Sequence, residues 1–404
     1  MVWIFIWLFS NVIITLFARH KKQKLIYFMK SIAVISHNYP SRSMPQNGAF
    51  VYNLVQELGK IQNIVVIAPF KITDVFKRKG KDYGPESCKV IRPLYLSLGN
   101  RRFLGLNLHK LTTWSHNWAR NRALNSIVNK PSLIYCHFLS TGISVTPYVK
   151  KNKIPMIIAS GESSYSHIHS YYSKQEIVDF FDVTDFIICV SASNQKQLEK
   201  LGYDPRKMKV LPNTVDFTMF QPKAKDNAKK ALGIDTDKFV VGFIGHFIER
   251  KGPNRIIKAI SLLNDDKITL VCVGNGGALI ENNFTQIIPP VPNQKLPDII
   301  NAFDVFVLPT LSEGHCNVIE EAKACCVPII SSKGTTVETQ IENGYNGFLI
   351  NPLDINEIKE HILILFKNPE LRKKMSNNLR LDRGGYSLNA RAASINEIIE
   401  EYKK

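Results

Sequence analysis

The chain contains two successive series of short apolar runs that are rich in valine and isoleucine. The runs are continuous rather than alternating in polarity, which is the pattern of strands buried on both faces of a parallel sheet. Strand–helix alternation in two blocks predicts an α/β protein of two doubly wound, Rossmann-like domains. The runs are 32–36, 63–69, 132–138, 155–160, 186–191 and 209–213, then 239–245, 268–274, 285–291, 305–310, 327–332 and 347–350.

Amphipathic segments with helical spacing separate many of these runs, among them residues 48–60, 255–264 and 317–325. A polar, proline-bearing passage at 215–230 separates the two series and marks the expected domain boundary. The chain has 404 residues, a length that suits two domains. From about residue 356 onward the sequence is charged and helical in pattern.

The first 28 residues form an apolar N-terminal segment with two interpretations. Residues 1–18 carry no charge and approach the minimum length of a membrane span, and the basic run 19–24 follows them. A cleaved signal is not expected, because the basic residues follow the apolar stretch. The segment is either one N-terminal anchor or the product of a misassigned start, with Met29 as the true beginning. Both place the bulk of the chain on the cytoplasmic side.

The net charge of +18 favours anionic partners. Two interpretations stay open, namely contact with an anionic membrane surface or acceptor, and an ordinary basic surface. The sequence has no recognisable nucleic-acid module, so no nucleic-acid partner is expected. Seven cysteines without a C-x-x-C pair predict free thiols in a reducing compartment, and Cys136, Cys189 and Cys272 fall in strand-like runs.

Two glutamates stand eight positions apart in "LSEGHCNVIEEAKACCVPIISS", residues 311–332. Asn317 and Glu320 resemble a capping pair, which predicts Asn317 as the N-cap of a helix. Glu313 then lies in the preceding loop and Glu321 about one turn inside the helix. Helix N-termini attract phosphate, so Glu313 could face an attached sugar and Glu321 a ribose diol. Spacing alone favours two solvated glutamates at a helix start, and it argues against a glycosidase pair.

Five sequence blocks together resemble the retaining glycosyltransferases of the GT-B fold, in the large E-x7-E family (glycosyltransferase group 1, family four). "PTLSEGHCNVIEEAKACCVPIISS" looks like that motif, from Glu313 to Glu321, and the match covers most of the chain from about residue 30. The resemblance implies two facing domains with the donor site in the cleft between them. The other four blocks are 36–58, 188–222, 241–260 and 333–354.

The resemblance also assigns domains and site residues. Residues 29–215 would bind the acceptor, 216–385 the nucleotide-sugar, and 386–404 would form a helix that packs back toward the N-terminal domain. Lys251 would clasp the donor diphosphate, so that neither metal nor cofactor is expected. Glu313 would contact the transferred sugar. The remaining donor-side assignments are Glu321 at the ribose, backbone N–H groups of Gly314, His315 and Cys316, Asn317 at the helix start, Val291 beside the base, and Gly48 for close backbone approach.

The sequence departs from the family pattern at two positions. His246 stands where the family usually has arginine, and Arg250 could substitute for it. Ser160, followed by Glu162, stands where a histidine often lines the acceptor side. His137, after another strand, matches a further family histidine and could line the acceptor pocket and take part in catalysis; a strand-end structural role is the alternative.

These observations predict a retaining transferase at the cytoplasmic face of the membrane. It would move a sugar from a nucleotide donor, UDP- more than GDP-, to a saccharide or lipid-linked acceptor in surface polysaccharide assembly. The alternatives are a catalytically degenerate binding protein, an epimerase or phosphorylase of related fold, and a nucleic-acid binder. Residues 235–237 (D-T-D) and 274–277 (G-N-G-G) are interpreted as turns, not as a metal or dinucleotide motif.

Overall fold

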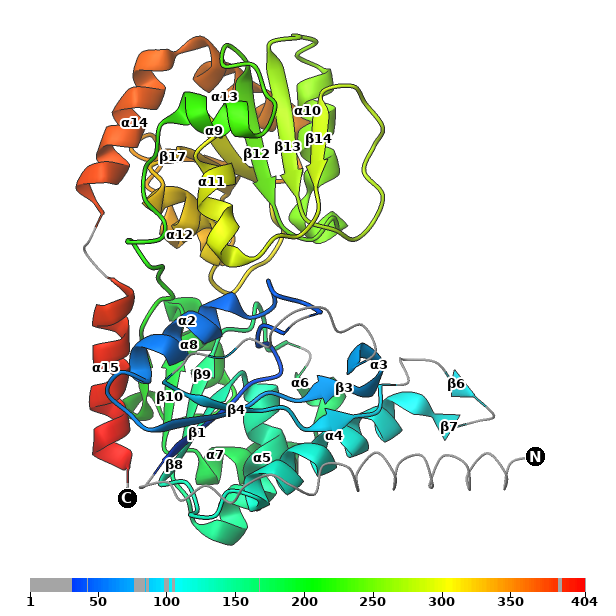
Figure 1. Cartoon of the computed structure of the whole chain (residues 1–404), viewed down its shortest axis with the longest axis vertical. Coiled ribbons are helices and arrows are strands. Elements are labelled where there is room, and N and C mark those ends of the chain that lie inside the picture. The colour runs from blue at the N-terminus through cyan, green and yellow to red at the C-terminus, as the bar shows by residue number, and fades with distance from the viewer. Residues whose placement is uncertain are drawn as a thin grey trace.

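The structure is a computed structural model that describes residues 31–403 except 42, 76–83, 85–86, 98–101, 104–105, 167 and 384–386. The expectations for residues 1–28 therefore lie outside the described residues. Two domains lie one above the other, each a parallel sheet covered by helices (Figure 1). This arrangement confirms the predicted fold class.

The N-terminal domain is built on a parallel sheet of seven described strands, in the order β11-β10-β9-β8-β1-β2-β4. The central strands are buried along their whole length, because both faces of the sheet are covered by helices. The strands are β1 (Ile32–Ile35), β2 (Ile64–Ile67), β4 (Lys89–Ile91), β8 (Leu133–His137), β9 (Met156–Ser160), β10 (Phe186–Cys189) and β11 (Met208–Val210).

Helices of both faces complete this domain, and short paired strands extend one edge. The small pairs are β3 (Phe70–Lys71) with β5 (Leu94–Tyr95) and β6 (Arg102–Phe103) with β7 (Leu106–Asn107). The helices are α2 (Ala49–Leu58), α3 (Ile72–Val75), α4 (Leu108–Asn125), α5 (Leu139–Asn152), α6 (Ile168–Tyr171), α7 (Lys174–Val183) and α8 (Ala192–Lys200), with the 3₁₀ turn η1 (Pro205–Lys207).

The C-terminal domain has a parallel sheet of six described strands, in the order β14-β13-β12-β15-β16-β17. Its strands are β12 (Phe239–Ile244), β13 (Ile268–Val273), β14 (Thr285–Ile288), β15 (Val305–Leu308), β16 (Ile329–Ser332) and β17 (Gly347–Ile350). Its helices and 3₁₀ turns are α9 (Lys225–Ala231), η2 (Glu249–Lys251), α10 (Pro253–Ser261), η3 (Asn293–Lys295), α11 (Leu296–Ile300), α12 (Asn317–Ala324), η4 (Thr336–Gln340), α13 (Ile355–Lys367) and α14 (Pro369–Leu381).

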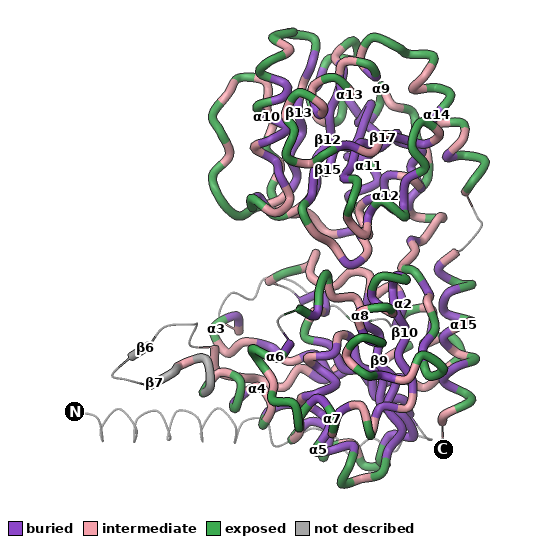
Figure 2. The backbone as a smooth tube through the Cα atoms, turned by 180° about the vertical axis from the view of Figure 1, so that it is seen from behind, coloured by how far each residue is buried: buried purple, intermediate pink, exposed green. Residues whose placement is uncertain are grey.

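The chain crosses from one domain to the other twice. After α14 it returns to the N-terminal domain as α15 (Leu388–Tyr402), which packs against α2. Ala392, Ile395 and Ile399 of α15 are buried in the same core as residues of β1 and α2. In Figure 2 the buried positions of α15 lie on its inner side, along the N-terminal domain.

Several local expectations are corrected or refined by the structure. The run 285–291 is a strand only to Ile288, because Pro289 and Pro290 cannot donate to a sheet ladder. Residues 235–237 lie in a turn, as predicted, whereas 274–277 form a loop in which Gly276 makes an isolated bridge with Phe247. The seven cysteines are free thiols, and six of them are buried.

Candidate functional site

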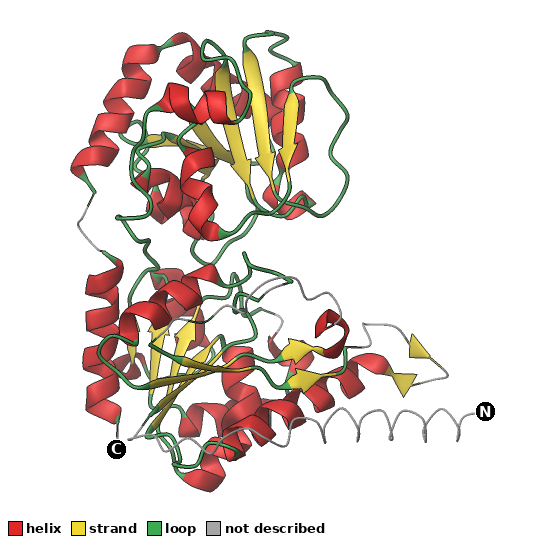
Figure 3. Ribbon diagram, in the orientation of Figure 1, coloured by secondary structure: helices red, strands yellow, loops and turns green. Residues whose placement is uncertain are grey.

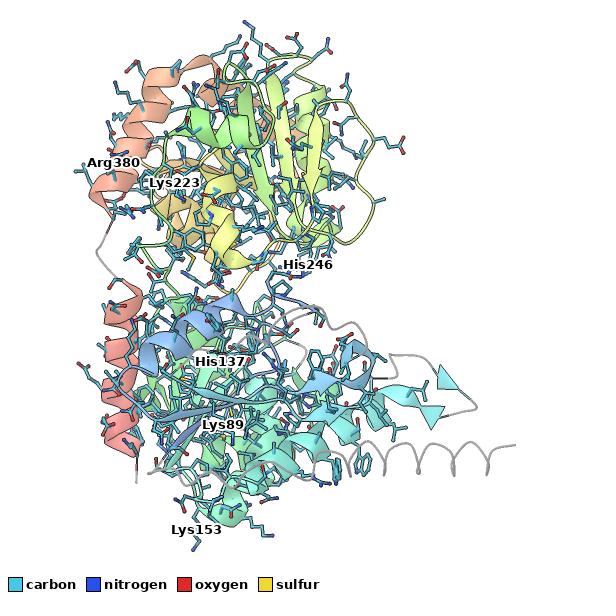
Figure 4. The ribbon with its side chains drawn as sticks, in the orientation of Figure 1. Lys89, His137, Lys153, Lys223, His246 and Arg380 are labelled. Carbon is cyan, nitrogen blue, oxygen red and sulfur yellow. The ribbon has the colours of Figure 1, made fainter. Side chains whose placement is uncertain are left out.

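The carboxyl ends of both sheets face the space between the domains (Figure 3). Loops that leave these strand ends therefore meet there, as is usual for ligand sites in open α/β sheets. In Figure 4, His246 lies at the lower edge of the C-terminal domain and His137 in the upper part of the N-terminal domain. The sequence-predicted residues come from both sides of this space.

A three-residue charge cluster lies at the ends of β12 and β15. The Glu313 Oε1 oxygen is 2.9 Å from Lys251 Nζ and 3.1 Å from the Arg250 guanidinium. Lys251 and Glu313 are each 14% exposed, so this pair is largely shielded from water. Glu313 belongs to the loop after β15, and Lys251 ends the 3₁₀ turn η2 that follows β12. Two cations thus converge on one carboxylate.

Arg250, and not His246, completes this cluster. The Arg250 guanidinium also donates to the carbonyl of Ser312, and the Arg250 carbonyl accepts from the backbone N–H of Leu311 at 2.8 Å. These bonds fix η2 against the loop that carries Glu313. His246 is exposed and pairs through Nδ1 with the side-chain oxygen of Asn275 at 3.2 Å.

The start of α12 differs from the prediction. Cys316 is the N-cap and Asn317 is the first helical residue, so Asn317 does not cap the helix. The Cys316 N–H donates to Gln340 Oε1 at 2.9 Å, so this N–H is not available to bind a nucleotide-sugar. Glu320, expected to complete a capping pair, instead accepts from Gln340 Nε2 at 2.8 Å. The Gln340 side chain therefore bonds both the Cys316 N–H and the Glu320 carboxylate.

Glu321 presents an unpaired oxygen inside the site. Its Oε1 accepts from Asn293 Nδ2 at 2.8 Å, whereas its buried Oε2 has no hydrogen-bond partner among the described residues. Burial raises the pKa of Glu321 to about 7, and the hydrogen bond from Asn293 only partly opposes this shift. Asn53 of α2 lies 3.4 Å from Asn293, so this chain of polar groups crosses between the domains.

Two consecutive residues of the Glu313 loop touch the N-terminal domain. A Cβ atom on Gly314 would lie 2.5 Å from the carbonyl oxygen of Gly161 and 2.8 Å from that of Glu162. Only glycine fits this approach of one domain to the other. The His315 ring nitrogen Nε2 donates to the carbonyl of Asn213, in the passage that joins the domains, at 3.0 Å. The backbones of Gly314 and His315 are therefore held at the domain contact.

His137 ends β8 and points into a buried aromatic environment. Its ring packs edge-on against Phe50 of α2 and Tyr135, and it is 3% exposed. Its Nε2 has no hydrogen-bond partner among the described residues. Burial, and then the nearby charges of Arg391 and His37, lower the pKa of His137 to about 3. The ring is therefore neutral at physiological pH.

Ser160 and Glu162 are occupied inside the N-terminal domain. Ser160 is fully buried, and its hydroxyl bonds the Tyr165 hydroxyl. The Glu162 carboxylate accepts from the backbone N–H of Leu139 at 2.6 Å and from Tyr165 at 3.2 Å. Ser160 therefore does not face an acceptor, and Glu162 caps the first turn of α5 with its side chain.

Gly48 and Val291 lie on opposite sides of the domain contact. Gly48 precedes α2 with φ of 69°, and a Cβ atom there would lie 2.0 Å from the carbonyl oxygen of Asn38. Val291 is partly buried against the C-terminal core, two residues before Asn293. Gly48 is thus required by the turn itself, and Val291 lies next to the residue that holds Glu321.

Sequence reasoning missed three polar residues of this region: Asn293, Gln340 and Asn213. Each acts on a residue far away in the chain, and none belongs to a motif with a local spacing signal. Among the described residues, no cluster of histidine, cysteine, aspartate or glutamate could hold a metal ion. Nor does any described helix combine the length and apolar character of a membrane span.

Family models match both domains of the chain. The model for "Glycosyltransferase Family 4" matches residues 48–218, and the model for "Glycosyl transferases group 1" matches residues 224–382. The fold is that of GT-B enzymes, since sucrose-phosphate synthase of Thermosynechococcus elongatus superposes with a TM-score of 0.74 over 92% of this chain and 99% of its own, at 17% identity. The chain belongs to the group 1 glycosyltransferases of the GT-B fold.

Sequence relatives and a further structure lead to the same family. The chain is 28% identical to a teichuronic acid biosynthesis glycosyltransferase, TuaC of Bacillus subtilis, over 81% of this chain and 87% of TuaC. It is 25% identical to the Escherichia coli UDP-Gal:alpha-D-GlcNAc-diphosphoundecaprenol alpha-1,3-galactosyltransferase, over 62% of this chain and 70% of that enzyme. HepE of Anabaena, solved with UDP and glucose, has a TM-score of 0.70 at 16% identity, over 92% and 100% of the two chains.

Proposed function

We propose that this glycosyltransferase moves a sugar, with retention of configuration, from a nucleoside diphosphate donor to a hydroxyl of a lipid-linked saccharide in surface polysaccharide assembly. The observation that carries the proposal is the convergence of Lys251 and Arg250 on Glu313 at the end of the C-terminal sheet. A UDP-sugar is preferred over a GDP-sugar as the donor. The names of TuaC and of the galactosyltransferase, and the UDP bound to HepE, support the nucleotide and the acceptor class.

The cluster can bind a diphosphate by exchanging one anion for another. Lys251 and Arg250 already hold an oxyanion, the Glu313 carboxylate; Lys251 and Glu313 are largely shielded from water, and Arg250 is 40% exposed. A diphosphate carries more charge and more acceptor oxygens, so it can take over these cations. Glu313 is then released to accept hydrogen bonds from the hydroxyl groups of the donor sugar.

The ribose of the nucleotide suits Glu321. Its buried Oε2 atom is an acceptor without a donor among the described residues, and a ribose hydroxyl would supply one. Asn293 holds the other carboxylate oxygen and so fixes the orientation of the group. Val291, two residues earlier, would then lie on the base side of the nucleotide.

In the proposed reaction, the bond between the anomeric carbon and the diphosphate oxygen breaks as a bond to the acceptor oxygen forms on the same face. The acceptor proton passes to the departing phosphate, so the products are the glycosylated acceptor and a nucleoside diphosphate. Lys251 stabilises the charge that develops on the leaving group, which is the task of a fixed cation in a low-dielectric site. Glu313 orients the sugar.

The acceptor would approach from the N-terminal domain. His137 is neutral, and its buried, unpaired Nε2 would bond one hydroxyl group of a saccharide once the acceptor opens the aromatic contacts around the ring. Phe138, beside it, is partly buried, lies at φ of 74° and packs against Phe50 and His37. Aromatic faces of this kind suit the apolar faces of sugar rings.

We place this activity at the cytoplasmic face of the membrane, with peripheral contact or one N-terminal anchor. The net charge of +18 supports attraction to an anionic surface. Flotation with phosphatidylglycerol vesicles, comparing chains that start at Met1 and at Met29, tests it. Equal binding of both chains, lost at high salt, supports peripheral contact; binding by neither chain contradicts the placement.

Transfer with purified protein tests the proposed reaction. The protein is incubated with UDP- and GDP-sugars and an extract of lipid-linked acceptors, and nucleotide release and product mass are followed. Release from one donor should be lost in Lys251→Ala and Glu313→Ala but kept in Lys258→Ala and Glu281→Ala, whose side chains are exposed elsewhere on the domain. Nucleotide binding without transfer, with every donor and acceptor, would instead identify a degenerate binding protein. The anomeric configuration of the product decides retention.

A further inference from the structure

A second basic pocket lies in the C-terminal domain, separate from the donor-side cluster. Its volume is about 280 Å³. Figure 4 shows two of its residues, Lys223 and Arg380, on the flank of the domain beside α14, whereas His246 lies at the edge that faces the N-terminal domain. The pocket is lined by Pro222, Lys223, Lys225, Asn301, Asp304, Cys325, Cys326, Val327, Pro328, Pro369, Arg372, Lys373, Ser376 and Arg380.

Helix α14 supplies four polar lining residues, namely Arg372, Lys373, Ser376 and Arg380. Arg372, Ser376 and Arg380 recur every four residues and therefore lie along one stripe of the helix. Pro369, the first residue of α14, and Arg380, one residue before its end, both line the pocket, so the pocket runs along the whole helix. The stripe combines a half-buried cation, Arg372, with an exposed one, Arg380, and both line the pocket.

The charges of the pocket do not cancel. Five lining side chains are basic and one, Asp304, is acidic. Lys225 and Lys229 pair with Asp304 at 2.8 and 2.9 Å. Lys223 pairs with Asp298 at 2.6 Å. Arg372, Lys373 and Arg380 make no ion pair among the described residues, and the five basic and one acidic lining side chains leave an excess of four positive charges. Arg372 donates to the backbone carbonyls of Leu365 and Phe366, so Lys373 and Arg380 are the cations with neither an ion pair nor a carbonyl partner among the described residues.

We propose that this pocket is a second anion site, which takes a small phosphorylated ligand. Arginine and lysine side chains together with a serine hydroxyl are groups that bind phosphate oxygens. A volume of 280 Å³ is small for a drug-sized ligand and suits a phosphate or diphosphate group on a small carrier, not a whole nucleotide-sugar. This site goes beyond the proposed transfer reaction and does not rest on it.

The pocket adjoins two chain segments that continue to the donor side of the C-terminal domain. Cys325 and Cys326 directly follow α12, the helix whose first turns carry Asn317 and Glu321. The opposite wall is the end of the passage between the domains, held by Asn301 through the Lys223 N–H at 2.7 Å. An anion that joins α14 to both segments would fix their relative positions.

Calorimetric titration with inorganic pyrophosphate tests the proposal without any catalytic readout. A background with both Lys251→Ala and Arg250→Ala removes the two donor-side cations, so remaining binding reports on the second site. We expect one pyrophosphate per chain in this background. The affinity should fall about tenfold or more when Lys373→Glu is added, and stay unchanged with Lys374→Glu. Lys374 is an exposed neighbour on the same helix that does not line the pocket, so both variants change the net charge equally.

Each remaining outcome decides for or against the site. Absence of pyrophosphate binding in the background would overturn the proposal. Equal losses of affinity in both variants would also overturn it, because diffuse surface charge would then explain the binding. Arg380→Gln repeats the test if Lys373→Glu lowers the melting temperature. Flotation with phosphatidylglycerol vesicles distinguishes the source of the ligand. If Lys373→Glu abolishes flotation and Lys374→Glu does not, the ligand is a lipid headgroup. If Lys373→Glu loses pyrophosphate binding but floats like the wild type, the ligand is a soluble phosphate.

Discussion

The six-strand order of the C-terminal sheet recurs within the N-terminal sheet, but the two domains differ in the chemistry at the ends of their strands. In the C-terminal domain, Lys251, Arg250 and Glu313 stand on loops as charged groups that can exchange partners. In the N-terminal domain, His137 is buried and neutral, and Glu162 is tied to the backbone of its own domain. We therefore expect the C-terminal side to suit a charged diphosphate and the N-terminal side an uncharged saccharide. The same fold serves both, because the difference lies in the loops after the strands.

Removing a charge from the C-terminal side is the strongest test of this difference between the domains. We expect Lys251→Ala to lower the turnover number by about a thousandfold, because one fixed donor at a developing charge contributes roughly 3–4 kcal/mol. Stopped assays with the preferred UDP-sugar measure it, with Lys258→Ala as the control. A loss below about tenfold would mean that Arg250 alone supports the leaving group.

A pH experiment tests the buried acid of the same side. Burial raises the pKa of Glu321 to about 7, so the folded chain holds more protons than the unfolded chain between pH 4.5 and 7. The stability contribution of this group therefore falls as pH rises through that window, by about 3 kcal/mol in full. Glu321→Gln should raise the urea midpoint at pH 8 relative to wild type but leave it nearly unchanged at pH 4.5. Equal midpoints at pH 8 would contradict the buried, unpaired oxygen.

The contact between the domains can be tested at Gly314. Its missing Cβ atom allows the loop of Glu313 to lie against the carbonyl of Gly161. Gly314→Ala should separate the two sides and lower turnover by up to about a hundredfold, because small displacements of reacting groups have effects of this size. The melting temperature should change little. Full activity in this variant would show that the two domains do not approach in this way during the reaction.

The smallest effect is expected at His137, in the N-terminal domain. Burial lowers the pKa of His137 to about 3, so the folded chain holds fewer protons than the unfolded chain between pH 3 and 6.5. The contribution of His137 to stability thus falls as pH is lowered below 6.5, by about 2 kcal/mol at pH 5, opposite in sign to that of Glu321. The ring proton resonances of His137, assigned with His137→Gln, should not shift between pH 5 and 9. A midpoint near pH 6.5 would show a hydrated ring.

The sequence predicted the sheets well and the site only in outline. Continuous apolar runs identify strands because a doubly covered sheet leaves no polar face, and Glu313, Lys251 and Arg250 meet because loops after parallel strands share one edge. The cap at Asn317 was wrong because Gln340, from a distant turn, takes both Glu320 and the Cys316 N–H. Partners that lie far apart in the chain have no characteristic sequence spacing, so they could not be predicted from the sequence.

The return of α15 to the N-terminal domain has a consequence for synthesis. Ala392, Ile395 and Ile399 fill the core between α15 and α2, yet they follow the whole of the C-terminal domain in the chain. The first domain to leave the ribosome therefore cannot complete its core until the second has been translated. A nascent chain that stops after β17 would expose the apolar side of α2, a surface that chaperones bind. The C-terminal domain is, in folding terms, an insertion into a domain that finishes last.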